Sequence, residues 1–203
     1  MKLALPLISL LLATSGCVTA PPPTPIQGPP PSIAAQQPVV DPAAEDQRLM
    51  TFLDAAFEAQ VARSPQTLTA LGRKEQYDRL NNYTDAFAQQ GLELSQRQLA
   101  ELRAQFDPAR LSPAGRLSYR LFEEEVERGV ESFRWRRHGF PASTNGSPAG
   151  SVPVFLINQH RVSTVADAEA YVARLREVER VMNEITSNMR QQAAMGIVPS
   201  KFN

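Results

Sequence analysis

Nine of the seventeen prolines lie between Pro21 and Pro42, and this run divides the 203-residue chain into a short leader and a longer segment that can fold. Proline fixes φ and lacks a backbone N–H, so a stretch this rich in proline cannot build a helix or a core. We expect a semi-rigid polyproline II tether, which reaches roughly 70 Å at ~3.1 Å per residue. The alternative is a proline-rich ligand for SH3-like partners.

The leader has the pattern of a secretory signal. Met1-Lys2 is followed by an apolar run from Leu3 to Leu12 and then by small residues. That run is about half the ~20 residues a membrane-spanning helix needs, which favours a cleaved segment over residues 1–16. Ser15-Gly16-Cys17 resembles the end of a bacterial lipobox, with Thr14 where leucine is usual. The resemblance implies that Cys17 becomes a lipidated first residue, whereas an ordinary signal peptide would leave it unmodified.

The residue after Cys17 bears on the destination of the chain. Aspartate at this place tends to retain bacterial lipoproteins in the inner membrane, and Val18 stands here instead. We therefore expect an outer-membrane lipoprotein that faces the periplasm, with the membrane as a partner through several acyl chains. The expected organisation is a signal peptide over 1–16, a lipidated cysteine and linker over 17–44, and a helical domain over 45–203.

Charge and cysteine content exclude several classes of function. The 21 Lys and Arg balance the 21 Asp and Glu, so the broad basic surface of a nucleic-acid binder is missing. One cysteine and two histidines cannot complete a zinc site of the usual Cys/His kinds. Any metal site would need carboxylates or another chain, and we expect no cofactor here.

Apolar residues recur at helical spacing through most of the chain after Pro42. Gly91, inside the segment that begins near Thr84, is a candidate break because glycine costs up to ~1 kcal/mol relative to alanine within a helix. Stop signals follow at Gly72 and Gly196. Helix starts are expected at five places, namely Asp41-Pro42, Ser64-Pro65, Thr84, Ser112-Pro113 and the Thr164/Asp167 pair, which resembles a capping box.

The texture changes between His138 and Ser163, where proline and glycine punctuate the chain. We interpret this stretch as one long ordered loop, partly buried, in which only Val152–Ile157 has the composition of a short strand. The predicted fold class is all-α, with amphipathic helices in a bundle-like arrangement.

Three groups of residues are candidates for chemistry. His160 sits on the predicted loop among groups that could hydrogen-bond a substrate, and its structural alternative is a histidine satisfied by backbone and carboxylates. His138 follows the basic cluster of residues 134–137, where cations complement a helix C-terminus. The carboxylates of Glu123–Glu127 could act in pairs, yet consecutive helical residues diverge, so a solvated face is the alternative. H-E-x-x-H, G-x-S-x-G and Walker motifs are missing from the sequence, so no catalytic residue is assigned.

From Leu53 onward, a series of short segments in a fixed order carries a resemblance to a known family. The segments are Phe52-Leu53-Asp54, Phe57-Glu58, Ser64-Pro65, Thr69-Ala70-Leu71-Gly72, Gly150–Leu156, Val162-Ser163-Thr164 with Asp167, Tyr171, Arg174-Leu175 and Gly196–Pro199. They resemble a large family of bacterial exported proteins catalogued as domain of unknown function 885, which is related to gluzincin zinc peptidases. That resemblance implies a mostly helical fold, and in full-length members a zinc-binding H-E-x-x-H helix in the later part of the chain.

Two hypotheses follow from the resemblance. In the first, the chain is the N-terminal helical portion of a tethered zinc peptidase-like protein. It stops at Asn203, before any position that could align with the zinc motif, and is inactive alone. Zinc and a peptide substrate would then belong only to the complete protein. In the second, the chain is a non-enzymatic periplasmic lipoprotein, a binding or scaffold module.

Overall fold

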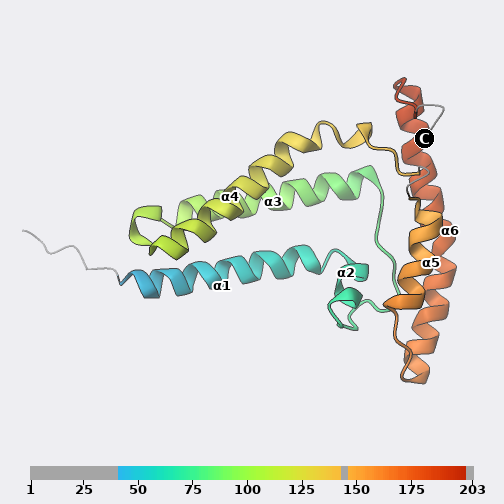
Figure 1. The fold of residues 1–203 in the computed structure, drawn as a ribbon, viewed down its shortest axis with the longest axis horizontal. Helices are drawn as coiled ribbons and strands as arrows, with labels where there is room; N and C mark the ends of the chain where they lie inside the picture. The colour runs from blue at the N-terminus through green and yellow to red at the C-terminus, as the bar shows by residue number, and fades with distance from the viewer. Residues whose placement is uncertain (1–40, 143–145, 200–203) are drawn as a thin grey trace, which may run out of the picture. The chain divides into compact units, whose positions relative to one another are not determined.

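A computed structural model describes residues 41–142 and 146–199, and every described element is helical (Figure 1). The all-α prediction is therefore confirmed for this part of the chain. None of the described helices combines the length and apolarity that a membrane crossing requires. The elements are α1 (Pro42–Val61), α2 (Pro65–Ala70), α3 (Asp85–Gln105), α4 (Pro113–Phe133), α5 (Pro148–Asn158) and α6 (Val165–Ala194), with short 3₁₀ turns η1 (Pro108–Arg110) and η2 (Arg136–His138).

Local capping sets where the helices begin. The Asp41 carboxylate accepts from the Ala43 N–H at 3.0 Å, so α1 starts at Pro42, inside the range predicted as linker. The same device operates at the other four predicted caps, Ser64, Thr84, Ser112 and Thr164, of which the last forms a complete capping box with Asp167. Each cap satisfies a backbone donor that the first helical turn leaves without a partner.

Glycine ends α2 and α6 as the sequence predicts. Gly72 and Gly196 have φ of +79° and +77°, a region that side chains disfavour and glycine adopts freely. By contrast, Gly91 does not interrupt α3, which continues through it to Gln105. A Cβ at this position would meet the Arg63 guanidinium at 3.6 Å, an ordinary contact distance.

Helices α1, α3 and α4 lie side by side around one apolar cluster (Figure 1). Leu49 from α1 and Leu102 from α3 are completely buried in it. A polar contact fixes the start of α4, because the Asp46 carboxylate on α1 accepts from both the backbone N–H and the hydroxyl of Ser112. The other buried members are Leu99, Phe106, Leu111, Tyr119 and Val126.

The second cluster lies between α5 and α6, which run alongside each other (Figure 1). The chain before α3 also lies on α6: the Leu80 and Tyr83 N–H groups donate to the Glu177 and Glu184 carboxylates at 2.9 and 2.8 Å. The buried members of this cluster are Leu80, Val152, Leu156, Val181 and Ile185.

The predicted long loop and short strand are wrong. Residues 148–158 form α5, so Val152–Ile157 is helical. Val152 and Leu156 lie four residues apart, on one face of a helix, and are 1% and 2% exposed against α6. This burial outweighs both the β-branched composition and Pro153, which is on the exposed side of the helix.

Candidate functional site

A fully buried arginine organises the most elaborate polar network of the described residues. Arg174 of α6 has no exposed surface, and its guanidinium reaches three segments of the chain. Nε donates to the Arg79 carbonyl at 2.8 Å, Nη1 to His160 Nδ1 at 2.8 Å, and Nη2 to Thr69 Oγ1 at 2.7 Å. The carbonyls of Pro65 and Gln76 lie at 3.4 and 3.5 Å from Nη2.

Within residues 41–142 and 146–199, no carboxylate forms an ion pair with Arg174. Neutral acceptors and two aromatic rings surround the charge instead, with the Tyr77 and Phe155 ring centroids 4.8 and 5.1 Å from Cζ. Burial lowers the pKa of Arg174, because a charged group loses hydration inside the protein. Arginine nevertheless keeps its proton in proteins, so the network is built around a buried cation.

His160 is the histidine that the sequence singled out, and both of its ring nitrogens are engaged. Since arginine can only donate, Nδ1 must accept from Arg174, and Nε2 therefore carries the proton and donates to the Asp167 carbonyl at 2.9 Å. The ring stacks on Tyr77 at 4.0 Å and meets the Tyr171 ring edge-on at 5.2 Å. Burial, reinforced by the positive charge of Arg174, lowers the pKa of His160, so the ring is neutral near pH 7.

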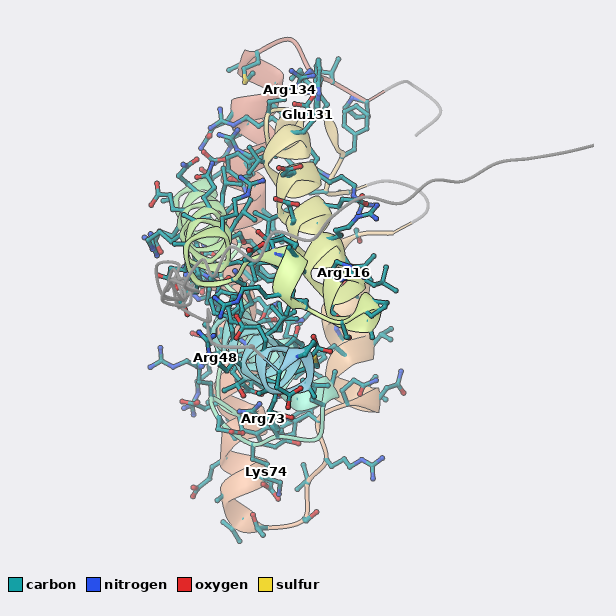
Figure 2. All side chains as sticks on the ribbon, turned by 90° about the vertical axis from the view of Figure 1, so that its left-hand side faces the viewer. Arg48, Arg73, Lys74, Arg116, Glu131 and Arg134 are labelled. Carbon is teal, nitrogen blue, oxygen red and sulfur yellow. The ribbon has the colours of Figure 1, made fainter. Side chains whose placement is uncertain are left out.

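Asp167 links this network to the start of α6. Its carboxylate binds the Lys74 ammonium at 2.8 and 2.9 Å and accepts from the N–H groups of Ser163 and Thr164, each at 2.9 Å. Lys74, labelled in Figure 2, is half-exposed, whereas the Asp167 side chain is buried. Hydrogen bonds from Lys74 and from the backbone hold the pKa of Asp167 well below its usual range.

Tyr77, whose ring stacks on His160, adds a further pair of hydrogen bonds to the network. Its hydroxyl accepts from the Arg161 N–H at 2.8 Å and donates to the Arg161 carbonyl at 3.1 Å. These bonds fix segments 73–80 and 159–164 to each other, and the Arg174 bonds to Arg79 and His160 fix both to α6. Chemically, the arrangement is a joint between segments: His160 has no lone pair left with which to abstract a proton or bind a metal.

The other candidates from the sequence do not join this network. His138 lies in η2, exposed, with its ring 5.1 Å from the Trp135 ring centroid. Glu123 and Glu127, one turn apart on α4, both pair with Arg103 of α3, which makes that run a solvated helix–helix contact. Cys17 lies outside the described residues. The described part of the chain also brings no three His, Cys, Asp or Glu side chains together in a metal-binding arrangement.

Sequence reasoning did not identify Arg174 as a centre, although one signal was available. Arg174 falls between Tyr171 and Val178 on the apolar face of α6, three and four residues away respectively. An arginine in the middle of an apolar stripe must find buried acceptors, because a charge without partners is costly there. The apolar pattern of α6 cannot predict which residues supply those acceptors, since Arg79 and Thr69 lie 95 and 105 residues away in the chain.

The fold and the network together define a helical protein with an internal polar joint. A family model described as "Bacterial protein of unknown function (DUF885)" matches residues 65–203, which include every residue of the Arg174 network. The chain belongs to this family, as the resemblance in its sequence predicted. Searches of curated proteins and of solved structures gave no match.

Proposed function

We propose that the chain is a lipid-tethered protein of the bacterial envelope whose described residues form the non-catalytic helical part of a zinc peptidase-like protein. The observation that carries the non-catalytic role is the engagement of His160. Both ring nitrogens are used inside the fold, one by Arg174 and one by the Asp167 carbonyl, so the best candidate for a base or ligand instead joins segments.

Zinc, which the family resemblance implies, does not fit the described residues. Structural zinc needs four ligands and catalytic zinc usually three, drawn from Cys, His, Asp and Glu. His160 has no free nitrogen, and no other described residues supply such a group. The role proposed for the described residues is therefore structural support of a catalytic part. The Arg174 network sets the positions of the segments around α6, and the catalytic part would pack against them.

The tether is supported by Ser15-Gly16-Cys17, with Val18 favouring the outer membrane and the periplasmic side. Because Cys17 is the only cysteine in the chain, a single substitution removes every thiol. We expect an alkyne-labelled palmitate fed to cells expressing the chain to label it and to place it in the outer-membrane fraction. Cys17→Ser should abolish both the label and the membrane association. Label that persists in Cys17→Ser would refute the lipid tether.

The intact mass of the mature protein from its native membrane tests the remaining part of the proposal. A mass well above that of residues 17–203 plus acyl groups supports a helical part within a larger peptidase-like polypeptide. Peptidase activity of that polypeptide, lost with a chelator and restored by zinc, completes the evidence. A mass that equals residues 17–203 plus acyl groups would overturn the peptidase relationship and leave a lipoprotein that acts as a binding or scaffold module.

A further inference from the structure

A pocket with both polar and apolar walls lies between the start of α3, the η2 turn with the residues after it, and the last turns of α6. Its volume is about 370 Å³, within the range of small-ligand sites. None of its lining residues belongs to the Arg174 network. The lining residues are Tyr83, Thr84, Asp85, Ala88, Arg136, Arg137, Gly139, Phe140, Pro141, Asn188, Gln191 and Gln192.

Hydrogen bonds connect the walls of the pocket to one another. The Gln192 side-chain amide, itself 6% exposed, donates to the Gly139 carbonyl at 2.7 Å. The Asn188 amide donates to the Tyr83 carbonyl at 2.6 Å. These bonds tie α6 both to the segment that follows η2 and to the segment that precedes α3, so the site is preorganised rather than a loose surface hollow.

Two guanidinium groups share a single carboxylate in this pocket. Asp85 accepts from Arg136 Nε at 2.8 Å and from Arg137 Nη2 at 2.8 Å, and each of the three side chains is about one-third exposed. The two arginines hold the pKa of Asp85 at about 2, so the carboxylate stays ionised. The trio therefore carries a net charge of +1.

One hydrogen-bond donor of Arg137 has no strong acceptor among the described residues, which suggests that a ligand supplies one. In the described part of the chain, Arg137 Nη1 meets only the Met195 thioether at 3.6 Å, and sulfur is a weak acceptor. A carboxylate is a far better partner for a guanidinium edge, because charged hydrogen bonds are the strong ones. The apolar part of the wall, formed by Ala88, Phe140 and Pro141, lies in the same pocket as Gln191 and Asn188, whose amides match a peptide group.

We propose that this pocket binds a carboxylate that follows an amide and an apolar side chain, as at the C-terminus of a peptide. The carboxylate binds Arg137, the preceding amide binds the Asn188 and Gln191 side chains, and the apolar side chain packs on Phe140 and Pro141. A free amino acid carries an ammonium beside its carboxylate, and the net positive charge of the pocket disfavours it.

Calorimetric titration of the full-length chain in detergent with four probes tests the proposal. We expect N-acetyl-phenylalanine and a tripeptide ending in phenylalanine to bind. N-acetyl-phenylalanine amide, which lacks the carboxylate, should bind at least about tenfold more weakly, since one charged hydrogen bond is lost. Free phenylalanine separates a peptide terminus from an amino-acid ligand, and binding tighter than that of the acetylated acid would overturn the peptide assignment. Equal binding of acid and amide, or no binding of the acid, would overturn the carboxylate site.

Arg137→Gln is expected to weaken binding of the acid about tenfold or more, the loss typical of a charged hydrogen bond. Arg134→Gln is the matched control, because Arg134 belongs to the same basic cluster but pairs with Glu131 at the end of α4 and does not line the pocket (Figure 2). Equal effects of the two substitutions would refute the site. Gln191→Glu covers the case in which Arg137→Gln fails to fold: Gln191 is exposed, and a carboxylate placed there should repel the ligand. Unchanged affinity in Gln191→Glu would also refute the site.

Discussion

Replacing Arg174 by methionine should destabilise the described fold substantially. Methionine keeps an unbranched apolar stem of similar reach and removes the guanidinium. Three short hydrogen bonds, to Arg79, His160 and Thr69, are then lost. The acceptors on His160 and Thr69 remain inside the protein, because these residues are 5% and 4% exposed.

The magnitude follows from those two acceptors. A buried polar group left without a partner costs about 1–3 kcal/mol, so two of them cost about 2–6 kcal/mol. Removing a buried cation that has no ionic partner returns part of its desolvation cost. We expect the free energy of unfolding to fall by about 3 kcal/mol, which lowers Tm by roughly 6–12 °C in a domain of this size.

The assay is thermal and urea unfolding, followed by circular dichroism, of the chain from residue 17 with Cys17→Ser. Arg176→Met is the matched control, because Arg176 lies on the same helix and is exposed, and its Tm should stay close to that of the parent. A double-mutant cycle of Arg174→Met with His160→Ala should show a coupling free energy of about 1 kcal/mol or more, since the two side chains are in direct contact.

Two results would refute this reasoning. If Arg174→Met melts within about 2 °C of the parent, the acceptors are satisfied by other means and the arginine does not organise the network. If the two substitutions are additive, the Arg174 to His160 hydrogen bond at 2.8 Å contributes nothing of its own.

Three further predictions concern other elements. Because folding lowers the pKa of His160 below its unfolded value near 6.5, the unfolded chain takes up more protons below that pH; stability should fall from about pH 6.5 toward pH 5, and His160→Asn should flatten this dependence in urea titrations. Gly115→Ala should destabilise the fold by about 1–3 kcal/mol, since a Cβ at position 115 would overlap the Asp46 carboxylate. Gly129→Ala on the same helix meets no neighbour and should stabilise the fold by about 0.4–1 kcal/mol. Equal shifts in Tm for the two variants would contradict this prediction. Pro153→Ala should raise the unfolding free energy by about 1–3 kcal/mol, because α5 regains a backbone hydrogen bond, and an unchanged urea midpoint would count against a helical α5.

Features set by a few neighbouring residues could be predicted from the sequence. The caps at Asp41, Ser64 and Thr164 depend on side chains two or three positions from the backbone groups they satisfy. The glycine stops at Gly72 and Gly196 depend on the conformational freedom of a single residue. These choices require no knowledge of distant parts of the chain, so helix starts and ends were largely correct.

Features that depend on distant partners could not be predicted. The sequence of α5 favours loop and strand, because Pro148, Pro153 and the β-branched residues weigh against a helix locally. What decides its structure is the burial of Val152 and Leu156 against α6, a contact that no local pattern reveals. The carboxylate shared by Arg136 and Arg137 was equally invisible, because Asp85 lies 51 and 52 residues away from them.

Among the described residues no carboxylate forms an ion pair with Arg174, and this gives the network a specific role. A carboxylate attracts a cation from many directions, whereas carbonyl, hydroxyl and imidazole acceptors must lie along the N–H bonds of the guanidinium. Thr69, Arg79 and His160 come from three separate segments, so all three must be correctly placed before the buried charge is satisfied. Any other arrangement of these segments leaves a cation without partners in the interior, which is heavily penalised. We infer that the network helps to select this arrangement of the segments around α6, in addition to the stability that the Arg174 hydrogen bonds contribute.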